Sequence, residues 1–244
     1  MKGLSGQTAG ILGLGLVFFS IALPIQANIV IPASNNATVQ PAGPRPGANG
    51  KQFFNMEGAS NGTFASFGVV DFQPGSMSVQ IASLTLALTQ ANAAFTNDGS
   101  LIFYLSTDTA TDIEPIGSPL IYSAADAPTG LGGQLSPIFL LGAGSFAQVS
   151  DGTKDTFSFS PSAAVIAYID SQVAAGGRLR LVIAPGDATV AATYAGFSNT
   201  EFAGPQLTLV TAVPEPGTAG STSLALFVFA ACLAKAVFPR PFNS

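Results

Sequence analysis

The chain of 244 residues has no histidine, no tryptophan and a single cysteine, Cys232. Without histidine, a Ser-His-Asp or Cys-His catalytic pair and a histidine-ligated zinc site are both excluded. A single cysteine also excludes an intramolecular disulfide. Charged residues make up only 9% of the chain, and the formal net charge is −5. Because nucleic-acid binding needs clustered lysine and arginine, we expect no nucleic-acid partner.

The amino terminus has the pattern of a secretory signal peptide over residues 1–27. Lys2 precedes an apolar stretch at 11–23, and the small residue Ala27 follows it. This stretch is shorter than the about 20 residues that a membrane-spanning helix needs. A membrane anchor and a buried helix are the alternatives. Cleavage by signal peptidase after Ala27 would leave Asn28 as the mature amino terminus.

A second apolar segment, residues 219–238, lies near the carboxyl terminus. As a helix it would be about 30 Å long, which is enough to cross a bilayer. Lys235 lies near its far end and Arg240 follows it. The positive-inside rule then predicts that residues 239–244 are cytoplasmic and that the body of the protein is exported. The alternative is a buried terminal helix.

Residues 213–218 read Val-Pro-Glu-Pro-Gly-Thr. The tripeptide Pro214, Glu215 and Pro216, followed by a hydrophobic helix and a basic residue near the chain end, resembles the PEP-CTERM sorting signal of bacterial exosortase substrates. The resemblance implies that an exosortase-type membrane protease recognises the tripeptide and releases the protein to the cell surface or biofilm matrix. The family usually ends in an arginine cluster, which Lys235 and Arg240 replace here. Judged by proline geometry alone, the segment is equally an accessible linker.

Between the ends, we expect an extended lead-in over residues 28–50, with at most one strand, and a β domain over 51–212. A change of apolar phase near Ser83 predicts a bulge. Arg178 and Arg180 alternate with apolar residues and are expected to face solvent. Short alternating runs between turn residues predict strands at 64–72, 79–88, 101–105, 137–141, 156–159, 178–183, 190–197 and 206–211.

One short helix is predicted after Ser160, with an apolar stripe of Val165, Tyr168/Ile169 and Val173 and a stop at Gly176-Gly177. The whole pattern predicts a mainly β fold, an antiparallel jelly-roll-like β-sandwich with one short helix, in addition to the signal peptide and the carboxyl-terminal transmembrane helix. Residues 192–207 resemble the last two strands of secreted bacterial sandwich modules, many of which bind glycans or decorate cell surfaces.

Side chains suited to catalysis or metal binding are few. The carboxylates available for a glycoside-hydrolase pair are those of Glu57, Asp71, Glu114 and Glu201, but nothing in the sequence brings two of them together. Loop aspartates that are candidates for calcium binding are Asp108, Asp112, Asp151 and Asp155, without EF-hand spacing. Turn closure through their own backbone is the favoured alternative. We therefore predict no catalytic residue, no metal site and no cofactor.

We expect an exported, non-enzymatic cell-surface or extracellular-matrix protein whose precursor is anchored in the inner membrane. Its expected partners are signal peptidase, an exosortase-type protease, the membrane and exopolysaccharide. The alternative is a carbohydrate- or calcium-binding surface module and, after it, a glycoside hydrolase. A concave sheet face with exposed aromatic rings would favour the binding module. With no tryptophan and four tyrosines, the 19 phenylalanines would have to supply the stacking surface.

Overall fold

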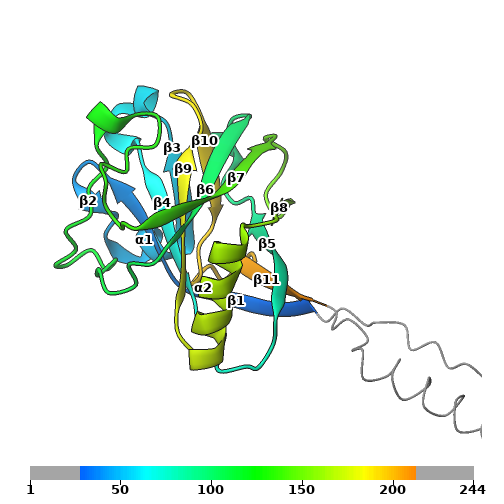
Figure 1. Cartoon of the computed structure of the whole chain (residues 1–244). Helices are drawn as coiled ribbons and strands as arrows, with labels where there is room; N and C mark the ends of the chain where they lie inside the picture. The colour runs from blue at the N-terminus through cyan, green and yellow to red at the C-terminus, as the bar shows by residue number, and fades with distance from the viewer. Residues whose placement is uncertain (1–27, 213–244) are drawn as a thin grey trace, which may run out of the picture.

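The computed structural model describes residues 28–212, which form a mainly β fold with antiparallel strand pairs (Figure 1). The predicted signal peptide and its cleavage site lie outside these residues. So do the sorting tripeptide, the apolar segment 219–238 and the basic tail. Neither α-helix within 28–212 combines the length and the apolarity that crossing a membrane requires.

The larger sheet follows the order β7-β6-β9-β4-β1-β11-β5-β8, with β2 paired to β1, and a separate sheet contains β10 and β3. The strands are β1 (Asn28–Gln40), β2 (Gly43–Pro44), β3 (Phe53–Glu57), β4 (Phe67–Phe72), β5 (Ile81–Thr89), β6 (Gly99–Ser106), β7 (Ile138–Phe146), β8 (Lys154–Phe159), β9 (Leu179–Pro185), β10 (Ala191–Ala195) and β11 (Gln206–Thr211). The helices are α1 (Gly47–Gln52) and α2 (Ala163–Ala175), with short 3-10 helices η1 (Ala59–Phe64), η2 (Ala93–Phe95) and η3 (Ala124–Asp126).

Strand β1 joins the two halves of the large sheet. Its first part, from Asn28 to Pro32, pairs with β11, and its second part, from Ala33 to Val39, pairs with β4. A strand that changes partners in this way turns the corner between two packed layers. On the other side, the edge strands β7 and β8 contact each other. The sheet is therefore nearly closed and sandwich-like.

The expected lead-in over 28–50 is instead part of the β domain and contains β1, β2 and α1. Pro32 has no amide hydrogen and lies where β1 changes partners. Asn36 is fully buried; its amide donates to the carbonyl of Gly50 at 3.2 Å and accepts from the backbone N–H of Phe197 at 2.7 Å. A buried polar side chain with satisfied hydrogen bonds does not disrupt a strand.

The main core lies between the two halves of the large sheet. Leucines of β5 and β11 face apolar residues of β4, β6 and β9 across it. Phe103 of β6 packs against Phe157 and Phe159 of β8, with ring centroids 4.6 and 5.0 Å apart. Gly144 of β7 makes room for this cluster, because a Cβ atom there would lie 2.4 Å from the Phe157 ring. The core depends on contacts between strands that are distant in the sequence.

A second apolar cluster lies on the outer face of β1, β4 and β9, under the long connection at 107–137. This cover explains why the prediction that Arg180 faces solvent is wrong. Arg180 is fully buried and donates two hydrogen bonds to the Asp71 carboxylate, at 2.8 and 2.9 Å. Arg178 remains partly exposed, with its guanidinium 3.3 Å from Asp71. Alternation along a strand predicts exposure only where nothing covers the outer face.

Helix α2 buries the predicted stripe of Val165, Ile169 and Val173 against the main core. It begins at Ala163, later than predicted, and ends at Gly176 in the left-handed conformation. The bulge predicted near Ser83 is confirmed, because the partner strand pairs on both sides of Ala82 and skips it. Figure 1 shows α2 and the small β3–β10 sheet at opposite ends of the core.

Candidate functional site

The small sheet forms the floor of a cleft through the alternation of its side chains. In β3, Phe54 and Met56 point into the main core, whereas Asn55 and Glu57 line the cleft. In β10, Tyr194 lies in the core and Thr193 on the cleft side. Because successive side chains of a strand point to opposite faces, one short sheet closes the core and presents a polar surface outside it.

Two loops that border the floor are fixed to β10 by amide side chains. Asn97, next to η2, donates to the carbonyl of Thr189 at 3.0 Å and accepts from the N–H of Ala191 at 2.7 Å. Asn61, in η1, donates to the carbonyls of Gly58 and Val190 at 3.1 and 2.9 Å. These bonds satisfy backbone groups at the start of β10 and just before it, and they hold both loops in place.

The resulting cleft has a volume of about 540 Å³, which is in the range of small-molecule sites. Phe64 of η1 and Phe95 of η2 belong to its lining and expose 61% and 68% of their surfaces. Large apolar side chains exposed next to a polar concave surface mark an interaction site more often than structural packing. Exposed aromatic rings therefore border the cleft, and they come from η1 and η2 rather than from a sheet face.

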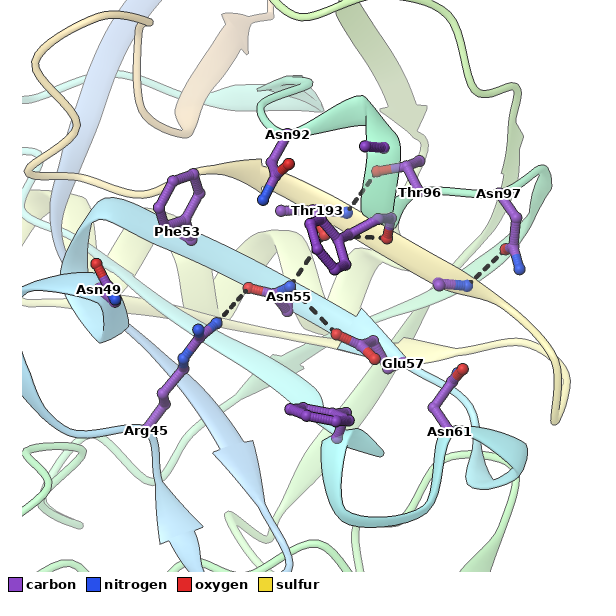
Figure 2. Close-up of a pocket in the computed structure, with 14 residues that line it drawn as sticks. Arg45, Asn49, Phe53, Asn55, Glu57, Asn61, Asn92, Thr96, Asn97 and Thr193 are labelled. Carbon is purple, nitrogen blue, oxygen red and sulfur yellow. Dashed lines mark hydrogen bonds between the residues drawn. The ribbon is translucent and has the colours of Figure 1, made fainter.

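Asn55 lies between the two charged groups of the cleft, as Figure 2 shows. Its amide donates to the carboxylate of Glu57 at 3.2 Å and to the hydroxyl of Thr193 at 3.0 Å. Its oxygen accepts a long hydrogen bond of 3.5 Å from the guanidinium of Arg45. Burial raises the pKa of Glu57 above its ordinary value of 4.5, and the bond from Asn55 and the charge of Arg45 oppose this shift.

The structure gives the four carboxylates proposed for a glycosidase pair separate environments. Glu57 lies in the cleft, and Asp71 is buried against Arg180. Glu114 binds Lys51 at 2.8 Å, and this hydrogen bond lowers its pKa. Glu201 is an exposed residue of the segment after β10. Glu57 is the one carboxylate among the described residues that line the cleft.

The aspartates considered for calcium accept hydrogen bonds from protein groups. Asp108 accepts hydrogen bonds from the hydroxyl of Thr111 and from the N–H groups of Thr111 and Ala110, at 2.9 and 3.1 Å, and these bonds, the hydroxyl's above all, lower its pKa. Asp112 likewise accepts from the N–H of Glu114, two residues ahead. This geometry is that of aspartate-closed turns.

The other two aspartates considered for calcium, Asp151 and Asp155, have different hydrogen-bond partners. Asp151 accepts from the backbone N–H of Ala93, and Asp155 accepts from the side chains of Gln90 and Tyr194. No cluster of three potential metal ligands occurs within residues 28–212. In the described part of the chain, these four aspartates hold loops and strand ends together through hydrogen bonds.

Comparison with protein-family models and with curated proteins finds no match for this chain. The geometry of the cleft thus carries the functional argument. The sequence singles out Glu57 from this cleft but not Arg45, Asn55, Phe64 or Phe95. The alternation of polar and apolar residues in β3 was a usable signal for the floor. The position of η2 beside β10 depends on tertiary structure, and no pattern in the local sequence predicts it.

Proposed function

We propose that the chain is an exported, non-enzymatic surface or matrix protein whose β domain binds carbohydrate in the cleft over β3 and β10. In this proposal, signal peptidase removes residues 1–27. An exosortase-type protease processes the precursor at Pro214, Glu215 and Pro216, and exopolysaccharide is the partner. The observation that carries the carbohydrate assignment is the combination of exposed phenylalanine rings with a hydrogen-bonding floor.

The chemistry of the cleft suits a sugar. Sugar rings have apolar C–H faces that pack on aromatic rings, and Phe64 and Phe95 offer such rings. The hydroxyl groups of a sugar both donate and accept hydrogen bonds. The amides of Asn49 and Asn92 belong to the lining and form no hydrogen bond with other described side chains. Amide groups match hydroxyls in both directions because they carry donors and an acceptor.

The positions of the first and last strands of the domain fit a domain that is tethered at one end. Asn28 pairs with Val210, so β1 begins next to the place where β11 ends. Figure 1 shows β3 and β10 at the far end of the domain from this point. A tether that follows β11 would leave the cleft open to extracellular polymers. Strand β1 passes from one half of the large sheet to the other, and this supports a jelly-roll-like arrangement of the β domain.

A binding role fits the cleft better than hydrolysis. Glycoside hydrolases of the common type use two carboxylates about 5 to 10 Å apart. Glu57 is the single carboxylate among the described lining residues. The proposal therefore assigns Glu57 to ligand binding.

The test is a binding panel of polysaccharides with the purified full chain, in a detergent that has no sugar headgroup. We expect at least one polysaccharide to bind and the Phe64→Ala and Phe95→Ala variants each to weaken it by roughly 2- to 13-fold, the size of an aromatic contact. Ile116→Ala is the matched control, because Ile116 is 91% exposed and lies outside the cleft. Absence of binding across the panel, or equal loss in the control, would contradict the carbohydrate assignment.

A further inference from the structure

Arg45 differs from the other basic residues of the domain. Residues 28–212 contain five lysines and arginines. Three of them form ion pairs with carboxylates within 4 Å, and Lys154 is exposed on β8 outside the cleft. Arg45 lies in the cleft and forms no ion pair with a described carboxylate within that distance. The cleft thus contains a cation with no carboxylate in direct contact, and Glu57 acts on it only across Asn55.

The guanidinium of Arg45 has N–H donors that bond no described residue. Its one side-chain hydrogen bond among the described residues is the long contact of 3.5 Å with the oxygen of Asn55. A guanidinium carries five N–H donors in a planar fork that matches both oxygens of a carboxylate. The backbone of Arg45 is held by a 2.8 Å bond from its N–H to the carbonyl of Thr38. The side chain therefore starts from a fixed point and faces the cleft, as Figure 2 shows.

From these contacts we infer that the cleft selects an acidic sugar, a uronic acid unit whose carboxylate is bound by Arg45 while its ring packs on phenylalanine. The inference rests on the proposed carbohydrate function and specifies its substrate class. Asn55 lies between Arg45 and Glu57, so a ligand carboxylate bound by Arg45 need not contact Glu57. Glu57 remains available to accept a hydrogen bond from a sugar hydroxyl.

The net charge of the domain implies that selection of an acidic sugar depends on contacts within the cleft. Residues 28–212 contain 12 acidic and 5 basic residues, a net charge of −7. Such a domain repels anionic polymers at long range and does not collect them non-specifically. Binding of a polyuronate would therefore depend on direct contact with Arg45. A neutral sugar could accept hydrogen bonds from the guanidinium but would lack the attraction between opposite charges.

The experiment compares an oligosaccharide of four galacturonic acid units with its methyl ester, which has nearly the same shape but no charge. Dissociation constants are measured by calorimetry with the full chain in the same sugar-free detergent. We expect the free acid to bind roughly 10- to 100-fold more tightly than the ester, the usual effect of a charged hydrogen bond. Arg45→Gln should remove this preference, and Arg45→Lys should retain part of it.

Lys154→Gln is the matched control, because it changes the net charge by the same amount outside the cleft. It should keep the preference of the parent. Equal binding of acid and ester by the parent, or an unchanged preference in Arg45→Gln, would overturn the inference and leave the proposed function standing if either binds. If neither binds, the inference is wrong, and the polysaccharide panel decides separately on the proposed function. Thermal midpoints of all variants establish that they are folded.

Discussion

The buried pair between Asp71 and Arg180 offers the sharpest test of the packing. Arg180 is fully buried, and the exposed fraction of the Asp71 side chain is 2%. Two hydrogen bonds of 2.8 and 2.9 Å join the guanidinium to the carboxylate. The same guanidinium donates to the carbonyls of Asp108 and Thr111, at 3.0 and 2.8 Å. It thereby fixes the start of the 107–137 connection to β9.

We expect Asp71→Asn to lower the free energy of unfolding by about 3 to 5 kcal/mol, because it leaves a buried cation without its counter-charge. Asparagine keeps the size of the side chain and one acceptor oxygen, so packing is nearly preserved. For a domain of this size the loss corresponds to a fall of about 6 to 20 °C in the melting midpoint. Urea unfolding of residues 28–212, followed by far-ultraviolet circular dichroism, measures it.

Two further variants show whether the cause is the uncompensated charge. Glu201→Gln changes the net charge equally at an exposed residue and should stay within about 0.5 kcal/mol of the parent. Combining Asp71→Asn with Arg180→Met removes both charges. The combined loss should be smaller than the sum of the single losses by about 1 to 3 kcal/mol. If Asp71→Asn also stays within 0.5 kcal/mol, the burial argument fails.

Three other predictions concern the core, the cleft and the tail. Gly144→Ala should cost about 1 to 3 kcal/mol in urea unfolding, because the added Cβ would overlap the ring of Phe157, and an unchanged midpoint would contradict this packing. Burial raises the pKa of Glu57, so its ionisation opposes folding. Glu57→Gln should therefore match the parent in stability below about pH 4.5 and be more stable than the parent as the pH rises. A variant that becomes less stable than the parent as the pH rises would refute this. Replacing the tripeptide at 214–216 by alanines should retain the protein in the membrane fraction, whereas equal release from both forms would identify the tripeptide as a linker.

The elements that were predicted correctly have local signals. The stripe of Val165, Ile169 and Val173 repeats at helical spacing, and Gly176 ends the helix as expected. The phase change beside Ser83 marks the bulge in β5 because one extra residue reverses the faces of a strand. The bounds of β11 agree with the predicted run at 206–211. In each case the pattern of neighbouring residues is sufficient.

The errors have a common physical origin in coverage by distant segments. Arg180 alternates with leucines as a surface residue would, yet the 107–137 connection covers it. Strand β1 contains Pro32 and the polar Asn36, which resemble loop residues in sequence. Their backbone and side-chain hydrogen bonds are satisfied by partners far along the chain. No single-sequence pattern states which loop will cover which strand.

In the proposed carbohydrate site, two polar residues hold the loops that carry the exposed aromatic rings. Asn61 and Asn97 use their amides on the backbone next to β10, so the loops that carry Phe64 and Phe95 are fixed before any ligand arrives. A fixed site loses less conformational entropy on binding than a mobile one. The stacking rings can therefore contribute most of their contact energy to affinity. Asn97→Ala should therefore weaken carbohydrate binding, because it removes the two bonds that hold the loop carrying Phe95, and an unchanged dissociation constant in the polysaccharide assay would contradict this role.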